Sequence, residues 1–272
     1  MNLAAILGLL FSIAIGTYSI LESTKNPKLF LNGHAIIIVL GGTFTVGLLS
    51  FPFARLFAAF KIVVRKVFGR EKLDYLGVIK QIVEISIAYR NDPKSVMGLL
   101  SPKTHPFLTD GIKLIVDYGF NAQEIDAILE NSVAGKKKRD REEVKVWHTL
   151  SRFPPAFGLL GATLGMISLL ETLGEPGSQD RIGPAMATAL VATFYGLMAA
   201  NLIFIPIAER LAEVSSNDII LRNIIKRGII LVAEKKHPSY IDEYLNSFLP
   251  PGARANSGQG PENVTSKGPL KA

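Results

Sequence analysis

Charged residues are absent from four long stretches of this 272-residue chain. Residues 1–21, 29–54, 153–170 and 182–208 contain no Asp, Glu, Lys or Arg, although His34 lies near the start of the second stretch. A helix of roughly 20 apolar residues crosses a hydrocarbon core, and roughly 17 residues suffice. Each stretch therefore predicts a membrane-spanning helix. The alternative is a set of buried core helices, in which uncharged runs of this length are rare.

The first stretch differs from a cleaved export signal, which has a basic start and an apolar part of roughly 7 to 15 residues. Residues 1–21 have no basic start and form a longer apolar run. We therefore expect a membrane helix that is retained in the mature protein.

The positions of the basic residues predict the orientation of these helices. Of the 30 Lys and Arg residues, 18 lie in residues 55–152, nine lie from residue 210 onward, and Lys25, Lys28 and Arg181 fall in the two remaining short loops. Under the positive-inside rule, both basic segments are cytoplasmic, and so are both termini. This topology accounts for the net charge of +7 without a nucleic-acid partner.

The composition agrees with this interpretation. Hydrophobic residues make up 48% of the chain and charged residues 19%, whereas a soluble domain carries about 25% charge. The expected fold is all-α, a polytopic membrane protein with a helical cytoplasmic domain between the second and third crossings. Its expected segments are 1–54 (two transmembrane helices), 55–152 (cytoplasmic domain), 153–208 (two transmembrane helices), 209–249 (cytoplasmic helix) and 250–272 (disordered tail).

The cytoplasmic segment has helical patterns. Apolar residues recur at helical spacing from Leu76, and again from Leu108 up to Gly119. Asn121, followed three residues later by Glu124, has the form of a capping box that opens another helix. The basic run 136–141 resembles a nucleic-acid patch, but in an inner loop a solvated helix face or contact with anionic lipid is favoured.

The residues needed for catalysis or metal binding do not occur together. The chain has no Cys, its four His residues are scattered, and it contains neither a phosphate-binding glycine loop nor a nucleophile turn. We expect no enzyme and no cofactor. Glu22 and Glu171 stand at helix ends, and no acid lies within the four stretches. Because ion carriers place a carboxylate or His inside the membrane, another chain must supply that group if this protein takes part in ion flow.

The third and fourth stretches carry small residues that allow close packing, among them Gly158 and Gly196. Their hydroxyl groups either bond back to helix carbonyls or line a pore. Pro155 and Pro206 each remove a backbone donor, so a hinge or a solvated carbonyl is expected beside them.

Several motifs of the chain resemble those of the MotA/PomA family of flagellar motor stator subunits. The resemblance runs from about residue 3 to residue 235. Its motifs are Pro155-Ala-Phe-Gly-Leu-Leu-Gly-Ala-Thr-Leu-Gly165, Gly183-Pro-Ala-Met-Ala-Thr-Ala-Leu190, Thr193-Phe-Tyr-Gly196 and Ala200-Asn-Leu-Ile-Phe-Ile-Pro-Ile-Ala-Glu-Arg-Leu211.

The resemblance implies a homopentamer in the bacterial inner (plasma) membrane, around two copies of a MotB-type partner. The single span of that partner carries the ion-binding Asp that this chain lacks. Ion passage would turn the pentamer against the rotor protein FliG. Pro155 and Pro206 match the two prolines near the channel, and Thr193 matches the threonine of the fourth helix.

Two departures from the family pattern bear on the ion and the rotor. Sodium-driven members have Thr where this chain has Ala162, and here the hydroxyl lies on Thr163, about 100° further round the helix. The transported ion is therefore expected to be H⁺, with Na⁺ as the alternative.

The family has an Arg and, some eight residues later, a Glu facing the rotor. Arg90 fits the first, but the second position falls near Gly98, so rotor contact is expected at Arg90 and Lys94.

Two alternatives remain open from sequence. A TolQ/ExbB-like energy-transducing channel subunit has the same membrane plan, but typically with three crossings and an outside N-terminus. A non-conducting membrane scaffold would tolerate replacement of Pro155, Ala162, Thr193 and Pro206.

Overall fold

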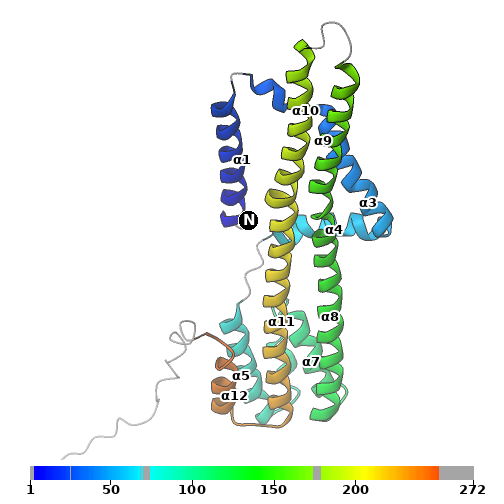
Figure 1. Cartoon of the computed structure of the whole chain (residues 1–272). Helices are drawn as coiled ribbons and strands as arrows, with labels where there is room; N and C mark the ends of the chain where they lie inside the picture. Colours follow the sequence, from blue (N-terminus) through cyan, green and yellow to red (C-terminus); the bar gives the residue numbers. More distant parts are fainter. Residues whose placement is uncertain (1–2, 25, 68, 70–73, 174–178, 251–272) are drawn as a thin grey trace, which may run out of the picture. The chain divides into compact units, whose positions relative to one another are not determined.

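The computed structural model describes residues 3–24, 26–67, 69, 74–173 and 179–250. Over these ranges the chain forms helices and no strand (Figure 1), which confirms the all-α class. The tail expected to be disordered lies outside the described residues from 251 onward. In chain order the elements are α1 (Leu3–Ser23), the 3₁₀-helix η1 (Pro27–Phe30), α2 (Gly33–Ile36), the π-helix η2 (Ile37–Gly41), α3 (Gly42–Ser50), α4 (Phe53–Val67), α5 (Tyr75–Asn91), α6 (Val96–Leu99), α7 (Pro106–Val116), α8 (Ala122–Leu150), α9 (Phe153–Thr172), α10 (Gln179–Met198), the π-helix η3 (Ala199–Phe204), α11 (Ile205–Ala233) and α12 (Pro238–Asn246).

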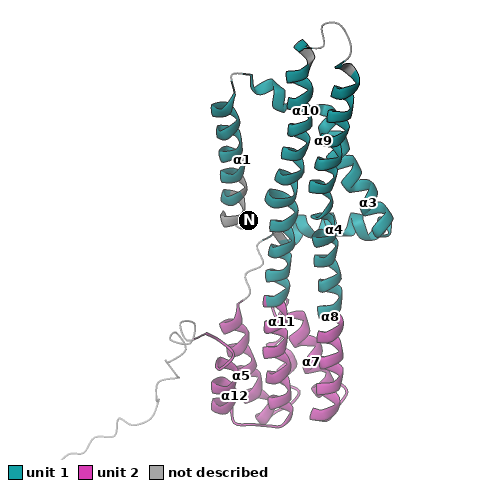
Figure 2. Cartoon of the chain, in the orientation of Figure 1, with its two compact units in different colours: residues 1–72, 137–216 teal, residues 73–136, 217–272 magenta. Residues whose placement is uncertain are grey.

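The helices belong to two compact units (Figure 2). Unit 1 comprises residues 1–72 and 137–216, and unit 2 comprises residues 73–136 and 217–272. Because α8 and α11 each run without interruption across a unit border, both helices contribute residues to both units. The segment borders expected from hydropathy and charge describe a different property, the boundary between lipid and water, and they stay a prediction.

Three helical stretches in the described residues are long and apolar enough to cross a membrane. They are Pro27–Ser50, a window within Ala122–Glu171, and a window within Ile182–Ala233. A shorter apolar helix, Leu10–Ser23, lies within α1. The chain is therefore a helical membrane protein with three candidate spans in the described residues.

The core of unit 1 joins the amphipathic helix α4 to α8 and α11. Leu56 of α4, Trp147 of α8 and Leu211 of α11 are each 2% exposed within one apolar cluster. The opposite face of α4 leaves Phe53 and Phe57 exposed. Burial of one face of α4 therefore fixes it to the two long helices, since apolar burial contributes about 25 cal/mol per Å².

Unit 2 is built around branched aliphatic side chains of α5, α7, α11 and α12. Ile82, Ile112, Ile225 and Ile241 are at most 1% exposed in its core. The helical spacing of apolar residues in the sequence follows the buried faces of these helices.

The start of α8 confirms the predicted capping box. The Asn121 backbone N–H donates to Glu124 Oε2 at 2.9 Å, and the Glu124 N–H donates to Asn121 Oδ1 at 3.0 Å. The preceding helix ends before Gly119, whose φ of +67° lies in the left-handed region that favours glycine. These local signals determine where α7 ends and α8 begins.

Candidate ion pathway and cytoplasmic contact residues

The small residues of α9 and α10 pack these two helices against each other. A Cβ atom added to Gly158 would lie 2.8 Å from the Ala192 carbonyl oxygen, and one added to Gly196 would lie 2.4 Å from the Pro154 carbonyl oxygen. A Cβ atom added to Gly165 would lie 2.9 Å from the Ala189 Cβ and 3.2 Å from the Ala189 Cα. The backbones approach so closely that no side chain fits between them, which is the usual role of small residues between membrane helices.

The two candidate threonines lie in different environments. The Thr193 hydroxyl donates to the Gly158 carbonyl across the α9–α10 contact at 3.5 Å, and the side chain is half-buried. Thr163 is exposed, and its hydroxyl donates to Leu160 O of its own helix at 2.8 Å. Ala162 beside it is half-buried. The structure therefore places Thr193 within the α9–α10 contact and Thr163 on the surface of the chain.

The two candidate prolines also differ. Pro155 lies in the first turn of α9, where backbone N–H groups have no partner within the helix, so it removes no hydrogen bond from α9. The sequence predicted a lost backbone hydrogen bond at Pro155. None is lost, because α8 already ends at Leu150, the chain leaves the helical path at Ser151 and Arg152, and α9 begins only at Phe153. Pro206 is exposed and follows directly on the π-helix η3, at the second position of α11.

A polar cluster joins α2 and η1 to α10. The Asn32 side chain accepts from the Ala35 N–H at 3.0 Å, capping α2, and its Nδ2 donates to Thr188 Oγ1 at 3.1 Å. The Tyr195 hydroxyl donates to the Phe30 carbonyl and accepts from the Asn32 N–H. This cluster satisfies the backbone at the turn between η1 and α2, which apolar neighbours could not do.

Replacing Asn32 with Ala should lower the thermal unfolding midpoint of the purified protein in detergent. The variant loses the cap of α2 and the bond to Thr188, and loss of a helix cap costs about 1–2 kcal/mol. Asn26→Ala is the matched control, because the Asn26 side chain makes no cap hydrogen bond to η1. Equal midpoints for the two variants would contradict the role of Asn32.

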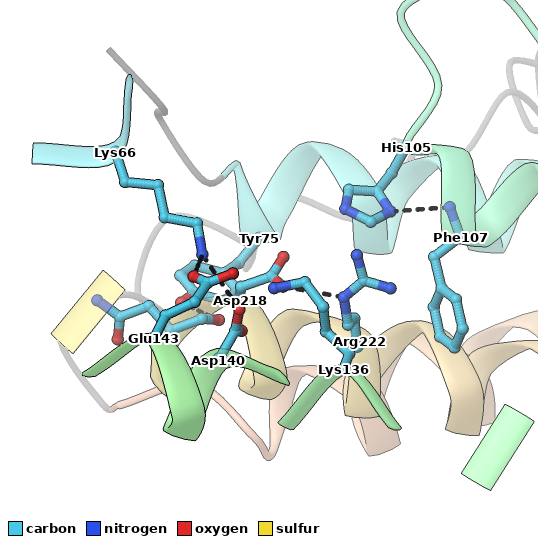
Figure 3. A network of polar contacts seen from close by, with 10 residues as sticks. Lys66, Tyr75, His105, Phe107, Lys136, Asp140, Glu143, Asp218 and Arg222 are labelled. Carbon is cyan, nitrogen blue, oxygen red and sulfur yellow. Dashed lines mark hydrogen bonds and ion pairs between the residues drawn. The ribbon is translucent and has the colours of Figure 1, made fainter. Parts of the chain in front are cut away.

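A buried ion pair holds α4 to α8 within unit 1 (Figure 3). Lys66 Nζ lies 3.1 Å from Asp140 Oδ1 and 2.9 Å from Glu143 Oε2. The Lys66 and Asp140 side chains are 11% and 3% exposed. Burial alone would lower the pKa of Lys66, but hydrogen bonds to the two carboxylates and their charges outweigh it and raise this pKa above 10.5. Lys66 therefore stays charged and paired at physiological pH.

A second charged cluster lies in unit 2 (Figure 3). Asp218 Oδ2 is 2.9 Å from Arg222 Nε and 3.3 Å from Lys136 Nζ. The Arg222 guanidinium lies over the Phe107 ring, 5.0 Å from its centroid. The His105 side chain caps α7 through Nδ1, which accepts from the Phe107 N–H at 3.2 Å. Burial, followed by the charge of Arg222, lowers the pKa of His105 below 6.5.

The lowered pKa of His105 predicts an acid-sensitive unit 2. The unfolded chain binds a proton at His105 at a higher pH than the folded chain does, so stability is lost as the pH falls through about 6.5. We expect the unfolding midpoint to drop between pH 7 and pH 5, and His105→Asn, which keeps a capping side chain, to lessen that drop.

His237→Asn is the matched control for this measurement. His237 caps α12 in the same way, accepting from the Ser239 N–H, but its side chain is exposed. The same pH dependence in His105→Asn as in His237→Asn would rule out His105 as the sensitive group.

The two candidate rotor-contact residues lie in unit 2 and are exposed. Arg90 Nη1 donates to the Lys235 carbonyl at 3.4 Å, where the chain leaves α11 and Lys235 has a φ of +52°. Lys94 follows Pro93 in a turn in which its N–H donates to Asp92 Oδ1 at 3.0 Å. Arg90 therefore also contacts the end of α11, which its sequence position did not reveal.

Sequence reasoning missed the Lys66 ion pair, the Asn32 cluster and the π-helix η3. One sequence feature pointed to the Lys66 ion pair: Asp140 is the single acid within the basic run 136–141. In the described residues, no group of three or more His, Cys, Asp or Glu residues is placed to hold a metal ion.

Comparison with known proteins identifies the class. Residues 102–245 match the model of the MotA/TolQ/ExbB proton channel family. The chain is 30% identical to Chemotaxis protein PomA of Vibrio alginolyticus, over 94% of this chain and 98% of that protein. It is 30% identical to Motility protein A of Aquifex aeolicus, over 89% of this chain and 91% of the relative.

The fold matches a solved structure titled the flagellar MotAB stator complex from Bacillus subtilis. The TM-score is 0.85 at 21% identity, covering 94% of this chain and all of the matched chain. The chain thus belongs to the MotA/TolQ/ExbB proton channel family. Within that family it is a flagellar motor stator subunit of the MotA/PomA type.

Proposed function

We propose that this stator subunit crosses the bacterial inner membrane four times, with both termini in the cytoplasm. α1 supplies the fourth crossing, because its 21 residues have one charged group, Glu22, next to the helix end. The basic residues concentrated in residues 55–152 and beyond residue 210 favour a cytoplasmic location for both segments. The loops near residues 22–33 and 171–183 are too short to fold outside the membrane.

The observation that carries the mechanism is the lack of an acid within the spans. Residues 29–54, 153–170 and 182–208 contain no Asp or Glu. A proton or sodium ion that crosses hydrocarbon needs a titratable or coordinating group on its way. A MotB-type single-span partner with a membrane Asp supplies this group, in line with the MotAB complex in which the matched fold occurs.

The proposed assembly contains five copies of this chain around two copies of the partner. Ion flow past the partner's Asp turns the ring, and the exposed charges of unit 2 act on the rotor protein FliG. Arg90 and Lys94 are the proposed contacts. Since Arg90 also binds the carbonyl of Lys235, the contact surface includes the end of α11.

The proposed ion pathway is lined by Pro155, Ala162, Thr163, Thr193 and Pro206. The Ala162 side chain has no oxygen to offer Na⁺, where sodium-driven members have the hydroxyl of a Thr, and this favours H⁺ as the coupling ion. Swimming speed should therefore be independent of sodium concentration and fall when a protonophore is added. Speed that followed sodium and resisted the protonophore would contradict proton coupling.

Deletion of the gene tests the function itself. We expect cells with intact but paralysed flagella, and rotation restored by a plasmid copy. Normal swimming combined with a weakened outer membrane would instead indicate a TolQ/ExbB-like role. Normal swimming with no other defect would indicate a scaffold.

A further inference from the structure

Helix α4 lies at the level where three of the uncharged stretches end. The helix begins inside the second stretch, at Phe53. Its buried face belongs to one apolar cluster with Leu150, which lies three residues before the third stretch, and with Ala208, the last residue of the fourth stretch. Under the proposed topology, these three stretch ends place α4 at the cytoplasmic edge of the membrane.

The direction of α4 differs from that of the spans in the same unit. The preceding helix α3 ends at Ser50, because Phe51 is extended (φ −138°, ψ 145°) before Pro52. In Figure 1, α4 runs across the direction of α9 and α10, which also belong to unit 1. A helix that lies across the spans, at the level of their ends, runs along the membrane surface.

The side of α4 beside its buried face carries large apolar side chains that no part of the chain covers. Phe53, Phe57, Phe60 and Val64 are 68%, 68%, 44% and 67% exposed. They recur at i, i+4, i+7 and i+11, the spacing of one helix face, which we call the apolar face of α4. A contiguous exposed patch of this kind is typical of a surface that binds a membrane or another protein.

Positive charge borders the apolar face. By helical spacing, Lys61 and Arg65 lie next to it on the side away from the buried residues, and both are exposed. The helix contains no acid, and its other two cations pair with the three acids in the adjoining part of α8. The pairs are Lys66 with Asp140 and Glu143, and Arg55 with Glu142. Within the described residues, Lys61 and Arg65 have no acid partner.

The charge of the surrounding surface favours anionic lipid over a second copy of this chain. In residues 141–152 and 205–216 the exposed basic residues are Arg141, Lys145 and Arg152, and the exposed acids are Glu209 and Glu213, of which Glu213 pairs with Arg210. A second copy would therefore present mostly like charge to Lys61 and Arg65. Phosphate groups above acyl chains supply the opposite charge beside an apolar layer, which suits an apolar face bordered by cations.

We propose that α4 is a lipid-binding element that selects anionic lipids. Its apolar face lies among the acyl chains, and Lys61 and Arg65 bind lipid phosphates, with their apolar stems along the apolar face. Each basic residue near an anionic surface favours binding about fivefold. The inference rests on the proposed spans and their orientation, and it involves neither ion flow nor the rotor.

The first test locates the apolar face relative to lipid. Because the chain has no Cys, a single Cys can carry a nitroxide label in the full-length chain, reconstituted in vesicles of phosphatidylcholine and phosphatidylglycerol. The label at Phe57→Cys should be relaxed more by oxygen, which concentrates in lipid, than by a water-soluble nickel chelate. Ala58→Cys is the matched control, since Ala58 is exposed about 100° further round the helix and should show the reverse order.

Two results of this test would overturn the proposal. Stronger relaxation by the nickel chelate at Phe57→Cys would show a solvated face, and weak relaxation by both agents would show a face covered by another copy. Ile37→Cys tests the span itself, because Ile37 is 70% exposed within Pro27–Ser50. Stronger relaxation by the chelate at both Ile37→Cys and Phe57→Cys would refute the span as well as the lipid-binding face.

The second test measures the selectivity for anionic lipid. A bimane label at Phe57→Cys should be quenched by doxyl-labelled phosphatidylglycerol at about fivefold or more lower concentration than by doxyl-labelled phosphatidylcholine. Adding Lys61→Gln and Arg65→Gln should make the two lipids equal. The control pair Lys103→Gln and Lys113→Gln removes the same charge from exposed positions of unit 2 and should leave the preference intact. Equal quenching without these substitutions, or an undiminished preference in the Lys61 and Arg65 variant, would overturn the selectivity.

Discussion

Gly196→Ala should abolish flagellar rotation. A Cβ atom at this position would lie 2.4 Å from the Pro154 carbonyl oxygen and 3.1 Å from the Pro155 Cα. Both neighbours are backbone atoms, so no side-chain rotation relieves the overlap, and α9 and α10 must move apart. Overpacking of this kind costs about 1–3 kcal/mol. It also displaces Pro155 at the start of the proposed ion pathway.

Gly183→Ala is the matched control on the same helix, because nothing lies within 4 Å of a Cβ added there. We expect normal rotation of tethered cells for Gly183→Ala and none for Gly196→Ala. The amount of each protein in the membrane should be measured in parallel, which separates failed assembly from failed rotation. Rotation of Gly196→Ala cells at wild-type speed would contradict the α9–α10 packing.

Lys66→Met should strongly destabilise unit 1. The substitution leaves Asp140, at 3% side-chain exposure, without this cation. Removal of one partner from a buried ion pair costs about 3–5 kcal/mol, because the remaining charge keeps its desolvation penalty. We expect a markedly lower unfolding midpoint in detergent and loss of motility.

Lys61→Met is the control for Lys66→Met, since Lys61 lies on the same helix and is exposed. The double variant Lys66→Met with Asp140→Leu should regain most of the lost stability, because it removes the buried carboxylate as well. If Lys66→Met and Lys61→Met had equal midpoints, the ion pair would not be a stabilising element.

Much of the secondary structure could be predicted because its signals are local. The capping box of Asn121 and Glu124 needs two residues three positions apart, and both hydrogen bonds form. The isoleucines of residues 219–230 recur at helical spacing, and α11 runs through them to Ala233. Patterns over a few turns suffice for such features.

Features that depend on distant residues could not be predicted in this way. Lys66 and Asp140 are 74 positions apart, and no local pattern pairs them. The same holds for Thr193, whose hydroxyl reaches Gly158 on another helix. The π-helix η3 depends on how one turn of backbone adjusts before Pro206, and the sequence predicted only a hinge or a solvated carbonyl there.

The most direct test of the account is the rotation of single tethered cells that lack the chromosomal gene, before and after the chain is expressed from a plasmid. We predict no rotation before expression, rotation after it, and a stop when a protonophore collapses the ion-motive force. Rotation without the chain, or rotation that continues after the protonophore in sodium-free medium, would contradict an ion-driven stator role.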